Sequence, residues 1–123
     1  MLNIQVDLCQ RLARAFPNAV VKRFVPEKIP DCLITVHREG GRRQNDLIDA
    51  PGVGIYVWAK TELETSRMAE SIAGLMSTLA FSEGYVTINQ EVMYSSPDPD
   101  TDHPRWYLSY TIQTYEPKGA ING

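Results

Sequence analysis

Residues 61–82 constrain the fold most, because they carry the signals of one long amphipathic helix. Thr61 and Glu64 are spaced as a capping box, in which a hydroxyl and a carboxylate each satisfy a free backbone donor of the first turn. Gly84 ends the segment. A helix of this length spans about 30 Å. Its apolar residues recur at helical spacing and predict one buried face: Met68, Ile72, Leu75, Met76 and Leu79.

The rest of the pattern predicts a second helix and five strands. Residues 3–16 repeat apolar groups at helical spacing, and Pro17 closes that segment. Five further segments are rich in β-branched and aromatic residues or alternate apolar with polar side chains: 19–25, 32–39, 52–59, 85–94 and 105–115. In the fourth of these strands, alternation predicts that one face holds Val86, Ile88, Val92 and Tyr94.

The order of these elements, αβββαββ, predicts an α+β domain built as a two-layer sandwich. We expect a mostly antiparallel sheet of about five strands with two helices packed on one face. The opposite face is then exposed and available for association. Tyr56 and Trp58 lie on one side of a strand that is apolar on both sides, so the second cover could be another subunit. The expected domain is 1–116, with a flexible tail at 117–123.

Size and charge exclude several classes of protein. A chain of 123 residues with 43% apolar and 22% charged side chains is typical of one globular domain. Its net charge of −3 argues against generic binding to a nucleic-acid backbone. Cys9 and Cys32 are interpreted as small buried hydrophobes in a reducing compartment. Since no apolar run approaches the roughly 18 residues of a membrane span, and no signal peptide is evident, we expect a cytosolic protein without membrane contact.

The polar run from Gly40 to Pro51 is the least ordinary segment. It lies between two predicted strands, and loops of about a dozen residues are usually functional or disordered. With few apolar residues it cannot build a core, so we expect it to become ordered against a partner. Its charges would pair with carboxylates of an identical neighbour and fix the register; a solvated loop is the alternative. The candidate interface residues are Arg38, Gly40, Gly41, Arg42, Arg43, Asp46 and Asp49.

The run Asp98, Asp100 and Asp102 resembles the opening of a calcium loop, where alternate carboxylates surround one ion. The pattern then fails, because His103 stands where the loop needs glycine and Ser109 where the bidentate glutamate belongs. A solvated proline–aspartate turn is the preferred interpretation.

Catalytic signals are missing from the sequence. Neither His37 nor His103 has another histidine or a cysteine at ligand spacing, and no nucleophile-elbow, zinc or phosphate-loop motif is present. We therefore expect no enzyme activity and no cofactor. A small metal-binding or nucleic-acid-binding domain is the alternative from a different class.

Four short landmarks follow one another between about Pro26 and Tyr115. They are Arg38-Glu39-Gly40-Gly41, Asp49-Ala50-Pro51, Val53-x-Ile55-x-Val57-Trp58-Ala59 before a capped helix, and Pro104-Arg105-Trp106-Tyr107 opening the last strand. In this order they resemble small tail-terminator proteins of long-tailed bacteriophages. Each landmark is short and degenerate, so the specificity of the resemblance comes from their order.

The resemblance implies a non-enzymatic virion protein. Such proteins cap the tail tube at its head-proximal end as a ring of six, which stops polymerisation and provides the surface for head joining. The implied partners are further copies of the chain, the major tail protein of the tube and the head–tail connector of the neck. The implied location is the virion neck, and the host cytoplasm during assembly. Another neck or head-completion protein is the nearby alternative.

Carried over to this chain, the resemblance implies that Arg38, Gly40, Gly41 and Asp49 shape an interface loop. It also suggests that Arg105 anchors a second loop through a carboxylate. The negative charge of that second loop would line a DNA channel in passive contact with the duplex. The candidate residues of the second loop are Asp98, Asp100, Asp102 and Arg105.

Overall fold

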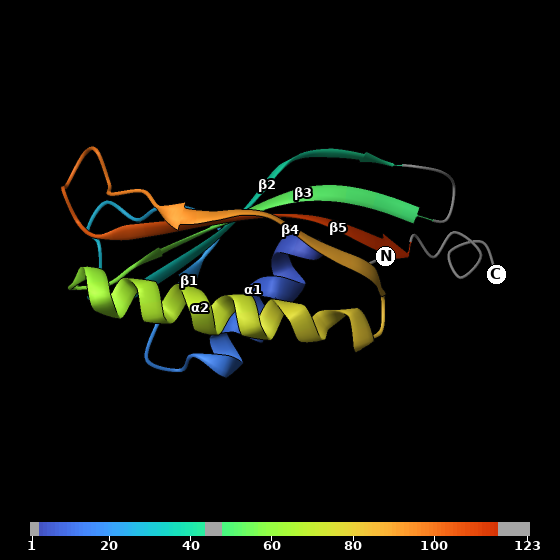
Figure 1. Ribbon diagram of the computed structural model, residues 1–123, viewed down its shortest axis with the longest axis horizontal. Helices are drawn as coiled ribbons and strands as arrows, with labels where there is room; N and C mark the ends of the chain where they lie inside the picture. Colours follow the sequence, from blue (N-terminus) through green and yellow to red (C-terminus); the bar gives the residue numbers. More distant parts are fainter. Residues whose placement is uncertain (1–2, 44–47, 116–123) are drawn as a thin grey trace.

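The computed structural model describes residues 3–43 and 48–115, which form two layers (Figure 1). One layer is a five-stranded sheet of order β1-β2-β3-β5-β4, and both helices lie against one face of it. β1 runs parallel to β2, whereas the other neighbouring strands are antiparallel. The predicted α+β class and element order are confirmed. The elements are α1 (Ile4–Ala15), β1 (Val20–Lys22), β2 (Leu33–Arg43), β3 (Ile48–Trp58), α2 (Glu62–Thr78), the 3-10 turn η1 (Leu79–Phe81), β4 (Tyr85–Ser95) and β5 (Arg105–Tyr115).

The predicted long helix is α2, which η1 extends to Phe81. Thr61 is its N-cap, because the backbone N–H of Glu64 donates to Thr61 Oγ1 over 3.1 Å. Met68 and Leu75 lie at the edge of the buried stripe and are only partly buried. The stripe itself consists of Thr65, Ala69, Ile72, Met76 and Leu79.

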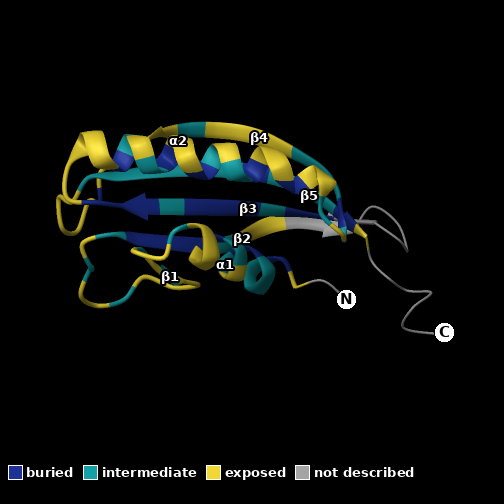
Figure 2. Ribbon diagram, turned by 90° about the horizontal axis from the view of Figure 1, so that it is seen from below, coloured by how far each residue is buried: buried dark blue, intermediate teal, exposed yellow. Residues whose placement is uncertain are grey.

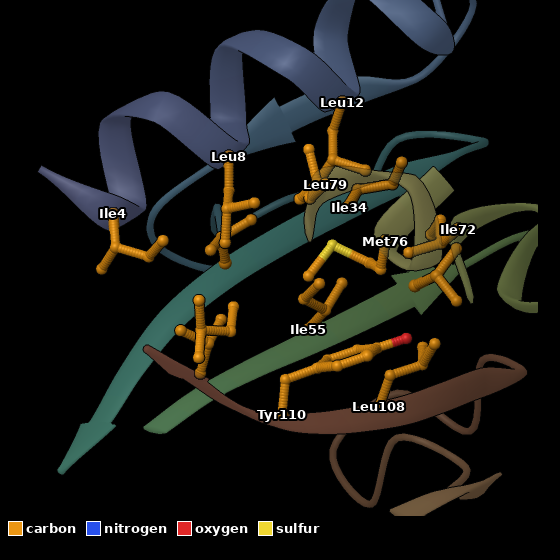
Figure 3. Close-up of a cluster of buried hydrophobic side chains, with 14 of the residues drawn as sticks. Ile4, Leu8, Leu12, Ile34, Ile55, Ile72, Met76, Leu79, Leu108 and Tyr110 are labelled. Carbon is orange, nitrogen blue, oxygen red and sulfur yellow. The ribbon is translucent and has the colours of Figure 1, made fainter. Parts of the chain in front are cut away.

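The core lies between the helices and one face of the sheet, which we call the covered face (Figures 2 and 3). Leu8 and Leu12 of α1 reach it from one helix, and Ile72 and Met76 of α2 from the other. Buried apolar surface of this kind supplies most of the stability of a domain. The covered face consists of Ile34, Val36, Val53, Ile55, Val57, Leu108, Tyr110 and Ile112.

The prediction for the faces of β4 is wrong beyond residue 90. Ile88 pairs with Ile112 toward the helices, but the register shifts between Gln90 and Val92. Such a bulge adds one residue, and every side chain after it moves to the opposite face. Tyr94 therefore pairs with Tyr107 on the side that no helix covers. We call that side the open face.

The prediction of a loop at residues 40–51 is also wrong, because most of these residues belong to two paired strands. β2 runs to Arg43 and β3 begins at Ile48, with residues 44–47 outside the described part. The register shifts between Arg38 and Gly41, and Gly40 adopts a φ of 93° at that point. Backbone pairing of residues 41–43 with residues 49–51 gives these parts of the predicted loop strand structure within the chain itself. Asp46 and the predicted tail 117–123 lie outside the described residues.

Candidate functional site

Four rings lie in a row across the open face, one from each of four neighbouring strands. His37 of β2 meets Tyr56 of β3 edge-on, with ring centroids 5.7 Å apart. Tyr56 lies 4.7 Å from Tyr107 of β5, which lies 5.6 Å from Tyr94 of β4. Aromatic pairs across strands stabilise a sheet and fix its register. We call these four side chains the aromatic row.

Arg105 lies over one end of this surface. Its guanidinium carbon is 4.5 Å from the ring centroid of Tyr56 and 5.6 Å from that of Trp58, which are cation–π distances. Arg105 Nε donates to the carbonyl of Ser96 over 2.7 Å, and Nη2 to the Ser96 hydroxyl over 3.2 Å. The arginine therefore anchors the second loop as expected, but its hydrogen-bond partner is Ser96 and not a carboxylate.

The loop 96–104 closes over Trp58 through Asp98. Trp58 is 1% exposed, and its Nε1 donates to Asp98 Oδ2 over 2.9 Å. The backbone N–H of Asp100 donates to the other carboxylate oxygen over 2.9 Å. Burial alone would raise the pKa of Asp98, but these hydrogen bonds, one from Thr101 and the charge of Arg105 outweigh it and lower that pKa. Asp98 thus holds the loop in place, whereas Asp100 and Asp102 are exposed.

Glu39 reaches across β3 from β2 to β5. The hydroxyl of Tyr107 donates to Glu39 Oε1 over 2.5 Å. A Cβ atom on Gly54 would come within 2.1 Å of that same oxygen, so only glycine leaves a path for the side chain. Burial and the hydrogen bond to Glu39 raise the pKa of Tyr107 to about 12. The glutamate therefore joins three strands on the open face.

His37, at one end of the row, is oriented by a neighbour on its own strand. Its Nε2 lies 2.9 Å from Thr35 Oγ1. Burial lowers the pKa of His37, and the nearby carboxylate of Glu39 opposes that effect only in part. The imidazole is thus neutral near pH 7 and serves as one ring of the row.

The two predicted groups of site residues lie far from each other. Arg38 and Gly40 lie toward the end of the β2–β3 pair, whereas the loop 96–104 lies at the opposite end of the sheet (Figure 1). The backbones of Gly41, Arg42, Arg43 and Asp49 pair within the sheet, and their side chains are outside the described part.

Sequence reasoning missed the centre of the open face. Tyr56 was placed on the second face of its strand. Glu39 and Tyr107 appeared only within landmark segments and Tyr94 only on a predicted strand face, so none of these three was predicted as a site residue. The signal was Gly54 between large residues in a strand, which often marks close approach of another group. Alternation alone does not show which group approaches.

The fold and this face together define a two-layer α+β domain with one uncovered, aromatic sheet face. No family model matches the chain, and no curated protein matches it either. Within residues 3–43 and 48–115, no three histidine, cysteine or acidic side chains gather as a metal site. None of the helices in that same part of the chain has the length and apolarity needed to cross a membrane.

Proposed function

We propose that the chain is a structural subunit that caps a bacteriophage tail tube at its head-proximal end, as part of a ring of six. The observation that carries the proposal is the open face, where an aromatic row of partly exposed rings lies on the side of the sheet that no helix covers. The four sequence landmarks named above support the same conclusion. The chain would stop tube growth and offer a surface to the neck connector.

The chemistry of the open face favours association over catalysis. Glu39 is bonded to Tyr107, Arg105 to Ser96, and Asp98 to Trp58. These polar groups satisfy one another, and a nucleophile poised beside a base is not found on the described part of this face. Tyrosine, tryptophan and arginine are enriched where proteins bind one another. Because their side chains are already held in place, binding loses little side-chain entropy.

The two ends of the sheet suit two different neighbours in this proposal. The paired ends of β2 and β3, with Arg38 and Gly40, form an arm that contacts the next subunit or the tube. The loop 96–104, with Asp100 and Asp102 exposed, lies at the other end and carries negative charge. A domain with unlike ends forms head-to-tail contacts, which close into a ring if the rotation allows it.

A second candidate is the binding of single-stranded nucleic acid, because aromatic rings on an open sheet can stack on bases. Glu39 in the middle of the face and the net charge of −3 oppose it. Fluorescence anisotropy with a labelled oligonucleotide at low salt separates the candidates. Tight, salt-sensitive binding supports the second candidate, and its absence removes it.

Electron microscopy of tail tubes with the purified chain tests the proposal. We expect density at one end of each tube, none along its sides, and arrest of further tube growth. An unrelated protein of similar size and charge serves as the control. Tubes that keep growing at full rate in a large excess of the chain would refute the proposal.

A further inference from the structure

The sheet has two free edges, formed by β1 on one side and β4 on the other. These strands stand at the two ends of the strand order β1-β2-β3-β5-β4 (Figure 2). Among residues 3–43 and 48–115, β4 pairs with β5 alone and β1 with β2 alone. The outer side of an edge strand carries backbone N–H and C=O groups that another strand can bind. The partner that such an edge selects is an extended segment of chain.

The directions of the strands allow the two edges to join in one sheet. β1 runs parallel to β2, whereas β2 and β3, β3 and β5, and β5 and β4 are antiparallel pairs. It follows that β4 and β1 run in opposite directions. If a second copy continues the sheet side by side, its β1 lies antiparallel to β4 of the first copy. Antiparallel pairing is slightly the more stable of the two kinds.

Exposed apolar side chains are concentrated at these edges. In the part of the chain that the structure describes, eight large apolar side chains are exposed, and five of them lie in β4, in β1 or directly after β1. Burial of such side chains drives the association of proteins. The five side chains are Val20, Phe24, Val25, Val92 and Tyr94.

The faces of the two edge strands match in one register. Val21 of β1 and Met93 of β4 both pack against the core, so both point to the covered side of the sheet. Their neighbours Lys22 and Val92 point to the open side, because side chains alternate along a strand. Placing Met93 opposite Val21 therefore brings Val92 opposite Lys22. The part of β4 after its bulge, residues 92–95, is close in length to the three residues of β1.

The two edges carry opposite charge. Lys22 and Arg23 at the β1 edge are exposed, and neither forms an ion pair within residues 3–43 and 48–115. The one charged residue of β4 is Glu91, which is also exposed. In the register above, Glu91 of one copy lies beside Arg23 of the next. Glu27 and Lys28, in the connection that follows β1, offset each other.

The other charged groups near β4 leave this contrast intact. Arg105 is hydrogen-bonded to the loop that follows β4, and Arg11, which reaches the turn before β4, is paired with Asp7. Arg14 and Glu83 lie toward the start of the strand and carry opposite charges. The uncompensated charge along β4 itself is therefore that of Glu91.

Pairing of two like edges is disfavoured by the same charges. Two β4 strands paired along their full length would bring the two copies of Glu91 close together, and two β1 edges would do so with Lys22 and Arg23. Like charges on facing strands are destabilising. Opposite charges at a contact select the partner and its orientation. The combination that joins opposite charges is β4 of one copy with β1 of another, which is a head-to-tail contact.

We propose that β4 of one copy binds β1 of a second copy, so that the sheet continues from chain to chain, with Met93 opposite Val21 and Glu91 beside Arg23. The occupant is a second copy because the chain carries both free edges, with compatible directions and opposite charge. This inference rests on the proposed function in one respect: the contact would join neighbouring subunits of the ring. It leaves the centre of the open face and the paired ends of β2 and β3 for other partners.

A disulfide trap tests the register in solution. Two chains carry Cys9→Ser and Cys32→Ser, which removes the native thiols. One of them also carries Val92→Cys and the other Lys22→Cys, at positions that face each other in the proposed pairing. Facing residues of an antiparallel pair are close enough for a disulfide. Under mild oxidation the mixture should give more product of twice the 13.8 kDa chain mass than either chain alone.

The control mixture replaces Lys22→Cys by Leu63→Cys, at a position 58% exposed on α2. We expect little linked product from it. Equal yields from the two mixtures overturn the proposal. A yield from the Val92→Cys chain alone that matches the mixture indicates pairing of two β4 strands and overturns it as well.

Sedimentation of chains with native cysteines provides the second arm. Glu91→Lys should weaken self-association about fivefold or more, because a pair of opposite charges becomes a pair of like charges. Arg23→Glu should act in the same way, and the two substitutions in one chain should restore association. Both positions are exposed, so the melting temperature should stay within a few degrees of the native value. Failure of the combined variant to restore association refutes the proposed contact.

Glu91→Gln separates the head-to-tail contact from pairing of two β4 strands. It removes the partner of Arg23 and should weaken the proposed contact by a few-fold. In a contact between two β4 strands it would remove a repulsion and strengthen association. Stronger association of the Glu91→Gln variant therefore overturns the proposal.

The outcomes also separate this contact from the proposed function. If the trap gives no specific product but the native chain still caps tubes, the contact is wrong and the function stands. If the specific product forms but tubes grow uncapped, the chains join edge to edge and the proposed function is wrong. Arrest of tube growth that is lost in Glu91→Lys and regained in the combined variant supports both.

Discussion

The two faces of the same sheet are built by different means. On the covered face, aliphatic side chains such as Ile55 and Leu108 pack against two helices and exclude water. On the open face, rings and polar groups bind one another across strands, as Glu39 does with Tyr107. The first arrangement stabilises the domain through burial, whereas the second orders a surface without covering it. Substitutions on the two faces should therefore have separable effects.

The largest expected effect on stability comes from the covered face. Ile72→Ala removes a fully buried side chain from the middle of α2 and leaves a cavity. We expect it to lower the unfolding free energy by about 2–5 kcal/mol. Urea denaturation followed by circular dichroism measures this. A change near zero would show that the stripe of α2 does not face the core.

Asp98→Ala should have the next largest effect on stability, and it acts at the border of the open face. The substitution leaves the indole N–H of Trp58 buried without its acceptor. An unpaired buried donor costs about 1–3 kcal/mol. Tryptophan fluorescence during unfolding, which Trp58 and Trp106 both contribute to, measures the loss of stability. Asp98→Asn serves as the milder control, because its amide oxygen can still accept the hydrogen bond from Trp58. Equal stability of Asp98→Ala and the native chain would contradict the role given to this carboxylate.

Acid should selectively remove the stabilisation that the ionised side chain of Asp98 gives to the native state. Its folded-state pKa is lower than the ordinary value of 3.8, so the ionised form stabilises the native state. This stabilisation is fully present at pH values above the ordinary pKa, and it is lost as the pH falls through the folded-state pKa. The stability difference between the native chain and Asp98→Asn should therefore narrow below about pH 4. A difference that is constant from pH 7 to pH 2 would contradict the direction of the shift.

Gly54→Ala should have a smaller effect, confined to the open face. The added Cβ displaces the carboxylate of Glu39, which is free to swing away, and breaks its bond to Tyr107. The loss of such a bond costs about 1 kcal/mol. The pKa of Tyr107 should fall below about 12, since one of its causes disappears. NMR titration of the ring measures this, and combination with Glu39→Ala should be less than additive.

The sequence predicted the covered face well, because buried faces of helices and strands require apolar residues at a regular spacing. Thr61 as a cap and Ile72 within a helical stripe are local signals, and α2 forms as they indicate. The order of elements follows from the same periodicities. Where side-chain period and burial agree, pattern alone is sufficient.

The open face was less predictable, since its features depend on contacts between distant strands. The bulge in β4 moves Tyr94 to the open face. The sequence between Gln90 and Val92 gives no signal that predicts this bulge. The glycines and charges after Arg38 resemble a loop, although backbone pairing needs no apolar side chain. The bond between Trp58 and Asp98 joins residues 40 positions apart. None of these is a local property.

The central claim is that the open face is an assembly surface, and one substitution tests it most directly. Tyr94 is 49% exposed at the end of the aromatic row and pairs with Tyr107, so Tyr94→Arg should lower the unfolding free energy by at most about 1 kcal/mol, the contribution of one cross-strand pair, and leave the chain folded. Leu63→Arg, on the helix layer, is the matched control. We predict that the Tyr94→Arg variant no longer binds tail-tube ends in electron micrographs, whereas the Leu63→Arg variant caps them like the native chain. Full capping by a folded Tyr94→Arg variant would contradict the account.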